Sequence, residues 1–149
     1  MQSVSFISAS AQKTKKIGAL FAQEILAFYG SRKNNKTGVV IGLMGDLGAG
    51  KTTFIQGFAS GLGIKEKITS PTFVIMKEFP ARCRPLKKTA FKNFYHCDFY
   101  RLHSKKDIRP LFIGAIMKNT ENIIVVEWAN RIKNFLPEGA IKIFIEHAG

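Results

Sequence analysis

Apolar residues show two kinds of spacing along this chain, one typical of helices and one typical of strands. From Thr14 to Tyr29 they recur every three or four positions, which predicts a helix with one apolar face. Residues 39–44 (VVIGLM) and 123–126 (IIVV) are instead continuously apolar, as expected for strands covered on both faces. Residues 141–146 (IKIFIE) alternate between apolar and polar side chains and predict a further strand.

Shorter segments complete the predicted order of elements. Residues 4–7 (VSFI), 72–79 (TFVIMKEF) and 94–99 (FYHCDF) are predicted as strands, the first of them at an edge. Residues 107–118 predict a short helix, with Pro110 in the first turn, where a helix tolerates proline.

Polar and glycine-containing stretches separate these elements. Residues 30–38 (GSRKNNKTG) predict a polar turn, and the glycines at 61–63 suit the end of a helix. Residues 80–92 contain two prolines and five basic residues, which predicts a loop or a long hairpin connection. Strands and helices alternate loosely and without repeats, so we expect a single domain over residues 1–149 with a three-layer α/β fold.

Residues 45–52 (GDLGAGKT) carry the clearest chemical signal. They match the phosphate-binding loop pattern G-x-x-x-x-G-K-[ST], between a predicted strand and helically spaced apolar residues. The glycines would let backbone N–H groups surround phosphate oxygens at the N-terminus of a helix. Lys51 would reach the β- and γ-phosphates, and the Thr52 hydroxyl would bind Mg²⁺. The motif predicts that the chain binds a nucleoside triphosphate.

Two carboxylates are placed to act on those phosphates. Glu127 ends the apolar run 123–126, and Asp98 shares one face of the 94–99 strand with Phe94 and His96. Ligands of open α/β sheets bind at the carboxyl ends of the strands, where both acids would lie. We therefore expect them to position Mg²⁺ and support hydrolysis. Each alone is also compatible with a solvated carboxylate at a strand end.

Residues beside these acids are weaker candidates. Ser70 and Thr72 flank Pro71, which stiffens the backbone, so their hydroxyls are candidates for sensing a γ-phosphate. Their spacing alone favours an ordinary turn at the start of a strand. Trp128 directly follows Glu127 and would either contact the nucleotide or pack in the core.

The histidines and cysteines predict no metal centre. His96 and His103 are better explained as packed or hydrogen-bonded side chains than as proton carriers, and no zinc-ligand spacing occurs. Cys83 and Cys97 are the two cysteines, which favours a reducing compartment. No segment has the length of a membrane-spanning helix and the N-terminus lacks a secretory signal, so the sequence predicts a cytoplasmic protein without a membrane partner.

The formal net charge of +13 has two interpretations. An acidic partner such as nucleic acid would explain it. A+T-rich coding, which favours Lys, Asn, Ile and Phe, would explain it equally well. Charge alone does not predict RNA binding.

Four short blocks together resemble a known family. GDLGAGKTT (45–53), SPT (70–72), HCDFYRL (96–102) and EW (127–128) stand in the same order as in the TsaE family, the bacterial ATPase of tRNA threonylcarbamoyladenosine (t6A) biosynthesis. The resemblance implies a three-layer P-loop NTPase fold with a small, mostly parallel mixed sheet. It also implies a weak ATPase that uses ATP and Mg²⁺ and acts with the TsaD–TsaB complex, in which TsaD modifies adenosine 37 of tRNA.

The resemblance also assigns roles by position. The catalytic residues would be Lys51, Asp98 and Glu127, and the metal ligands Thr52, Glu127 and Asp98. Nucleotide binding would involve the phosphate loop, its flanks and the segments near the adenine and γ-phosphate: Ala11, Thr14, Gly45, Leu47, Gly48, Ala49, Gly50, Lys51, Thr52, Thr53, Ser70, Thr72 and Trp128.

Two alternative functions stay open from the sequence. A small-molecule kinase would need an acceptor pocket and a lid with arginines, and no acceptor pocket is recognisable. An ATP-binding RNA module without hydrolysis would bind RNA in a strongly salt-dependent way. Residues 80–92 are more basic than is usual in the family, which makes them a candidate contact for tRNA.

Overall fold

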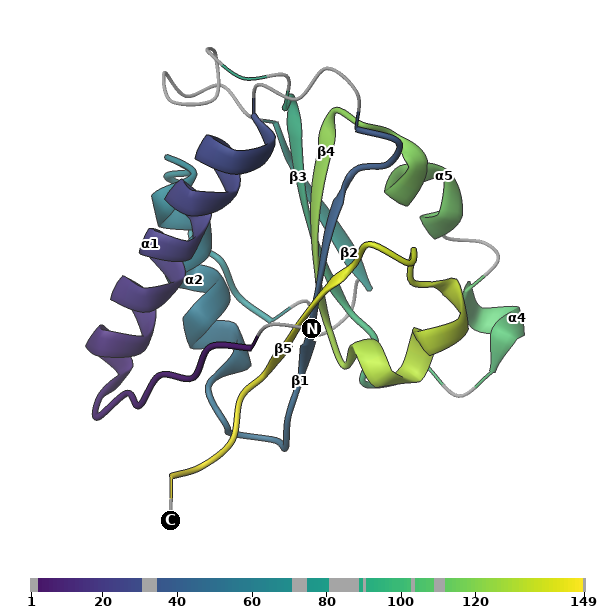
Figure 1. Ribbon diagram of the computed structural model, residues 1–149. Coiled ribbons are helices and arrows are strands. Elements are labelled where there is room, and N and C mark those ends of the chain that lie inside the picture. The colour runs from purple at the N-terminus through teal and green to yellow at the C-terminus, as the bar shows by residue number, and fades with distance from the viewer. Residues whose placement is uncertain are drawn as a thin grey trace.

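The computed structural model describes residues 3–30, 35–70, 75–80, 89, 91–102, 104–108 and 112–148. These residues contain a five-stranded sheet with the strand order β2-β3-β4-β1-β5 (Figure 1). Four strands run parallel: β1 (Val39–Met44), β3 (Asn93–Asp98), β4 (Asn122–Glu127) and β5 (Ile141–Phe144). The edge strand β2 (Met76–Pro80) is antiparallel to β3. The mostly parallel mixed sheet confirms the predicted fold class.

Helices cover both faces of this sheet. The long helices α1 (Ala11–Tyr29) and α2 (Lys51–Gly61) pack on one face (Figure 1). The short helices α4 (Lys105–Ile108) and α5 (Ile113–Lys118) lie on the other side, together with the 3₁₀ helix η2 (Ala129–Phe135). A separate apolar core fills each of the two interfaces. This arrangement makes three layers.

The central strands have the burial that their sequence predicts. All six residues of β1 and all six of β4 are buried. Side chains of β3 alternate between the two cores, with Phe94 facing the α1–α2 side and Cys97 facing the α5–η2 side. Burial raises the pKa of the Cys97 thiol, so this cysteine stays protonated inside the sheet.

The two long helices begin at local signals. Ser10 caps α1, because its hydroxyl oxygen accepts the backbone N–H of Lys13 at 3.1 Å, so the helix begins before the predicted Thr14. α2 begins at Lys51, directly after Gly50, whose φ of 105° is a left-handed conformation that glycine adopts readily. The helix N-terminus therefore faces the loop that precedes it.

α1 and α2 approach each other closely at Gly57. A Cβ atom added there would overlap the backbone carbonyl of Lys15 on α1. Gly57 is helical, so the close approach of two backbones, and not an unusual φ, requires glycine at this position.

Replacing Gly57 with alanine should therefore destabilise the fold. We expect a loss of about 1–3 kcal/mol, typical of overpacking, and a lower midpoint of thermal unfolding. The matched control is Gly114→Ala in α5, where a Cβ meets no atom within 4 Å. That change should leave the midpoint unchanged or raise it slightly, because alanine is the better helix former. Equal midpoints for the two variants would contradict the tight α1–α2 contact.

Two predicted elements are wrong. Residues 4–7 form no strand, and Val4, Phe6 and Ile7 are 77%, 72% and 83% exposed, because a short apolar segment becomes a strand only where a neighbouring edge pairs with it. Residues 107–118 do not form one helix: α4 ends at Ile108 and α5 begins at Ile113. Phe112 between them has a left-handed φ of 51°, which a right-handed helix cannot contain.

Other predicted boundaries shift or lie outside the described residues. β5 ends at Phe144 instead of residue 146. β2 occupies the second half of the predicted strand 72–79, whose residues 72–74 are not among those described. Most of the predicted basic loop 80–92 also lies outside the described ranges, as do Pro110 and His103. No helix in the described part of the chain combines the length and apolar character needed to cross a membrane.

Candidate nucleotide-binding site

The glycine loop connects the buried strand β1 to helix α2, as its sequence predicts. Gly45, Gly48 and Gly50 have φ values of 146°, 78° and 105°, a region that other residues rarely adopt. A Cβ on Gly48 or Gly50 would meet no atom within 4 Å, so the backbone conformation, and not crowding, calls for glycine there. The space above the loop is therefore open, and Leu47 at its tip is 72% exposed.

Lys51 folds back over this loop. Its Nζ atom donates to the carbonyl oxygens of Gly45 and Asp46, at 2.6 and 2.8 Å. The ammonium also lies 4.3 Å from the centroid of the Trp128 ring, within cation–π range. Burial lowers the pKa of Lys51, and the nearby carboxylates of Glu127, Asp98 and Asp46 oppose that shift. The Lys51 ammonium is therefore a buried cation at the bottom of the open space beside the glycine loop.

Glu127 is the central acid of the site. It ends β4, next to the glycine-loop strand β1, and is 3% exposed. Its Oε1 accepts the hydroxyl hydrogen of Thr52 at 2.9 Å, and its Oε2 lies 2.8 Å from Nε2 of His96. The first residues of α2 and the end of β4 therefore meet at one carboxylate.

Asp98 ends the neighbouring strand β3 and lies opposite Glu127 in the parallel register. Its Oδ2 accepts from the hydroxyl of Ser70 at 2.9 Å, and its Oδ1 accepts from the backbone N–H of Tyr100 at 3.0 Å. Ser70, one of the two candidate hydroxyls for sensing a γ-phosphate, thus contacts the second acid. Its companions Pro71 and Thr72 lie outside the described residues.

Trp128 closes one side of the site. Its backbone is left-handed, with φ 57° and ψ 43°, a strained conformation for a tryptophan. The indole packs against the ring of Tyr100, with 4.9 Å between centroids, and against the Lys51 ammonium. The sequence did not single out Tyr100 by itself; its position two residues after Asp98 was the available signal.

These residues line a cavity of about 280 Å³. It gathers residues from four separate parts of the chain: Leu47, Gly48, Gly50, Lys51, Thr52, Thr53, Ser70, Asp98, Tyr100, Glu127 and Trp128. Gly45 and Ala49 belong to the same loop without lining the cavity. Ala11 and Thr14 lie in the first turn of α1, where the Thr14 hydroxyl bonds Ser8 and the Ser10 carbonyl.

The oxygen atoms of side chains that line this cavity are suitable ligands for a hard cation that also binds phosphate. Among the described residues, no cluster of three or more His, Cys, Asp or Glu could hold a metal ion without other ligands. Mg²⁺ is usually bound through one or two carboxylates, a hydroxyl and substrate phosphates. Thr52, Glu127 and Asp98 supply donors of that kind on one side of the cavity.

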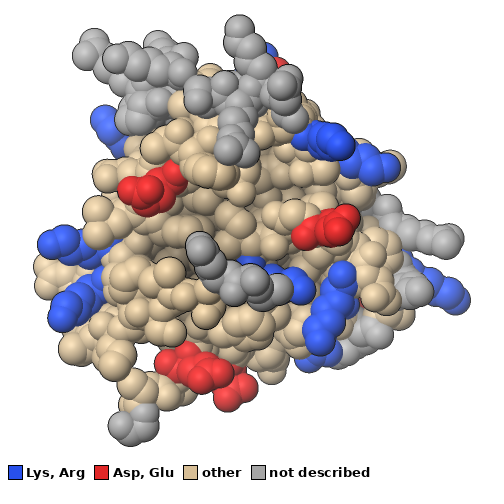
Figure 2. Space-filling model, in the orientation of Figure 1, with Lys and Arg blue, Asp and Glu red and all other residues tan. Residues whose placement is uncertain are grey.

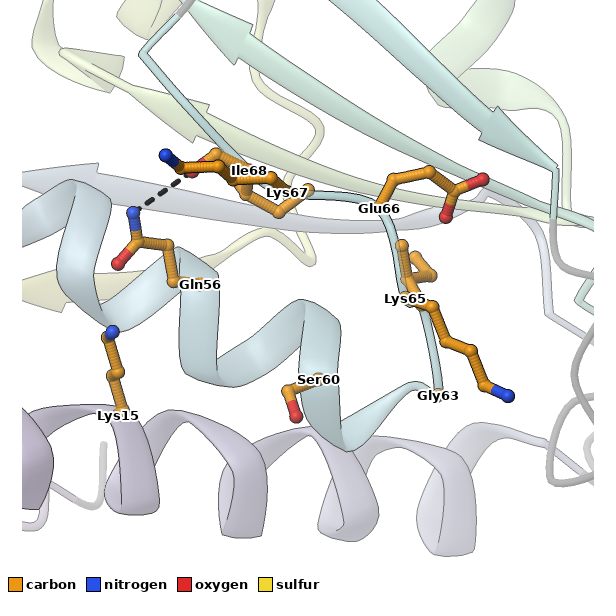
Figure 3. A pocket seen from close by; sticks show the side chains of 9 residues that line it. Lys15, Gln56, Ser60, Gly63, Lys65, Glu66, Lys67 and Ile68 are labelled. Atoms are coloured by element: carbon orange, nitrogen blue, oxygen red, sulfur yellow. Dashed lines mark hydrogen bonds between the residues drawn. The ribbon is translucent and has the colours of Figure 1, made fainter.

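A second cavity, of about 570 Å³, lies away from this site (Figure 3). It opens between α1, α2 and the segment that follows α2, where Gln56 donates to the carbonyl of Ile68 at 3.0 Å. Lys15, Lys65 and Lys67 line it, but neither the glycine loop nor the carboxylate pair reaches it.

Figure 2 shows Lys and Arg side chains on several separate parts of one face of the protein, with Asp and Glu between them. The basic charge on that face is therefore not concentrated in one patch.

The fold and the site together define the class of protein. A parallel strand leads through a glycine loop into a helix, and acids at the carboxyl ends of two further parallel strands face that loop. This is the architecture of a P-loop nucleotide-binding protein. The chain belongs to the TsaE family: the model of the family described as threonylcarbamoyl adenosine biosynthesis protein TsaE matches residues 8–149.

Individual relatives support the same family. The TsaE protein of Bacillus subtilis, a tRNA threonylcarbamoyladenosine biosynthesis protein, is 41% identical over 117 residues, which cover 76% of this chain and 65% of the relative. The protein of the same name from Treponema pallidum is 34% identical over 137 residues, covering 92% and 87%. The crystal structure of Bacillus subtilis YdiB superposes with a TM-score of 0.60 at 34% identity, covering 95% of this chain and 75% of that one. The resemblance seen in the four sequence blocks is thereby confirmed.

Proposed function

We propose that this chain binds ATP together with Mg²⁺ and hydrolyses it slowly, as an accessory subunit in the threonylcarbamoylation of adenosine 37 in tRNA. Relatives that carry the name of this tRNA-modification process support the biological role. The chemistry rests on one observation: Lys51, Thr52 and Glu127 converge in one cavity above the glycine loop. The partner would be the TsaD–TsaB complex. The chain would form a single domain over residues 1–149 and act in the cytoplasm.

Phosphate binding follows from the groups that the loop presents. Backbone N–H groups of the loop and the N-terminus of α2 attract phosphate oxygens. Lys51 would exchange the carbonyls of Gly45 and Asp46 for the β- and γ-phosphates, since charged oxygens are stronger acceptors. The ammonium would then offset the negative charge that develops as the bond to the γ-phosphorus breaks.

The hydroxyl and carboxylates would organise the rest of the reaction. Thr52 and Glu127 would hold the metal ion, which when bound supplies positive charge to the phosphate oxygens. Asp98 would accept a hydrogen bond from the attacking water and align it with the γ-phosphorus. Water would add to the phosphorus as the bond to the bridging oxygen breaks, ADP would leave with that electron pair, and the proton of the water would pass to the released phosphate. Ser70, already bonded to Asp98, would sense whether the γ-phosphate is present.

The composition of the cavity supports slow turnover by the isolated protein. Of the described residues that line it, Lys51 is the one with a positive charge. Many P-loop enzymes need a second cation, often an arginine from a partner, to reach full rate. A partner that docks beside Leu47 and Tyr100, at the exposed rim, would be placed to supply it. Direct contact of residues 80–92 with tRNA stays a prediction.

Hydrolysis should therefore depend on the partners. We expect a slow rate for the isolated protein and a rise of at least about tenfold with TsaD–TsaB and tRNA, since a completing arginine accelerates other P-loop enzymes by about 10³–10⁵. The measurement is phosphate release with each component omitted in turn. Adding the Lys51→Ala variant to the same complex reveals any hydrolysis by the partners. An unchanged rate in the full complex would contradict the accessory-subunit proposal.

A further inference from the structure

His96 is a buried polar residue that lies outside the nucleotide cavity yet contacts its central acid. The side chain is 1% exposed, and Nε2 lies 2.8 Å from Oε2 of Glu127. A carboxylate only accepts hydrogen bonds, so Nε2 carries the hydrogen and donates it. His96 is not among the residues that line the cavity.

The sheet explains how the imidazole reaches this carboxylate. β3 and β4 are parallel neighbours, with His96 opposite Val125 and Asp98 opposite Glu127. His96 and Glu127 are therefore diagonal neighbours on the same face of the sheet. His96 lies two residue pairs before the two acids in the parallel register, so its imidazole is between the apolar core and the site.

Both carboxylate oxygens of Glu127 therefore accept hydrogen bonds, and the two donors lie on different secondary-structure elements. Oε2 is bonded by His96 on the rigid strand β3, and Oε1 by Thr52 at the start of α2. A glutamate side chain has three rotatable bonds, and a buried carboxylate that lacks a donor carries a large desolvation cost. With His96 in place, the carboxylate has one preferred orientation, in which Oε1 faces the Thr52 hydroxyl.

We propose that His96 is a positioning residue for the metal–nucleotide site. Its Nε2–H fixes the orientation of Glu127, and this orientation lets Thr52 and Glu127 receive Mg²⁺ together with ATP. The inference rests on the proposed function, because it assigns Glu127 to the same metal site. Hydrogen-bonded groups behind metal ligands typically change metal affinity by about 10–100-fold when they are removed.

The test uses nucleotide binding and needs no hydrolysis. The chain has one tryptophan, Trp128, which lies in the cavity, so its fluorescence reports binding of a non-hydrolysable ATP analogue. The quantity compared is the gain in affinity when Mg²⁺ is added. His96→Gln keeps an amide N–H near the position of Nε2, whereas His96→Met has similar length and no donor. Cys97→Ala is the control: a buried change on the same strand that faces the opposite core.

In His96→Met, we expect the increase in analogue affinity caused by Mg²⁺ to be smaller by about 10-fold or more. Affinity for the analogue without Mg²⁺ should change by less than about threefold. His96→Gln and Cys97→Ala should keep most of the gain. If His96→Met does not fold, as judged by circular dichroism, His96→Asn replaces it, because its amide is one methylene too short to reach Glu127.

Three results would overturn the inference. Equal Mg²⁺-dependent gains in the glutamine and methionine variants would show that the donor is dispensable. Parallel losses with and without Mg²⁺ in the methionine variant would indicate a structural role alone. If Mg²⁺ does not raise the affinity of the unsubstituted protein for the analogue, the proposed function itself fails. The first two results would instead contradict only the role of His96.

Discussion

The Lys51→Ala variant is expected to lose ATP hydrolysis by about 10²–10³-fold, the usual effect of removing one well-placed group that stabilises transition-state charge. The loss should be this large because, among the described residues of the cavity, no other side chain is positively charged. ATP affinity should fall as well, since Lys51 would bind the phosphates in the ground state. Both quantities are measurable, the first by phosphate release and the second by Trp128 fluorescence.

Lys65→Ala is the matched control for this change. Lys65 lines the second cavity, away from the glycine loop, so its removal should alter hydrolysis by less than about twofold, as surface substitutions usually do. The fold should survive Lys51→Ala, because α2 retains its buried apolar residues. Hydrolysis that persists in a folded Lys51→Ala protein would refute the assignment of this loop to phosphate binding.

The second large effect is expected for Glu127→Gln. The change keeps the shape of the side chain but removes its negative charge, so the site loses an anionic group that would hold Mg²⁺. We expect hydrolysis to fall by about 10²–10³-fold, with the greater part of the loss in kcat, since the charge supports the transition state. Glu121→Gln is the control, because Glu121 is a 42% exposed surface residue whose ion pair with Lys92 contributes little.

Asp98→Asn separates the roles of the two acids. If Asp98 aligns water, this variant should bind ATP and Mg²⁺ normally and hydrolyse slowly. Full activity in Glu127→Gln combined with its loss in Asp98→Asn would transfer the central role to Asp98 and contradict the arrangement proposed above.

The site was predictable where its signal is local. The glycine loop, Lys51 and Thr52 are consecutive, and the apolar run before Glu127 is typical of a strand buried on both faces. Asp98 was placed by the general position of ligands at strand ends, and β3–β4 pairing puts it beside Glu127 as expected.

The features that could not be predicted depend on tertiary structure. The bond from His96 to Glu127 joins residues 31 positions apart and depends on the register between two strands. Residues 4–7 looked like a strand because their composition is apolar, but no local pattern tells whether an edge is available to pair with them. Phe112, directly before α5, has a left-handed backbone, which a residue of this type seldom adopts and which its sequence does not indicate.

The bonds from Lys51 to its own loop have a consequence for ligand selection. The carbonyls of Gly45 and Asp46 accept hydrogen bonds from the Lys51 ammonium, so the proposed phosphate binding would be an exchange of hydrogen-bond partners. A ligand without phosphates has no charged oxygens to replace these carbonyls, so Lys51 would keep its hydrogen bonds to the loop. Ligand selection by Lys51 would therefore depend on the number and charge of the phosphate groups, and the base of a bound nucleotide would be recognised elsewhere on the protein.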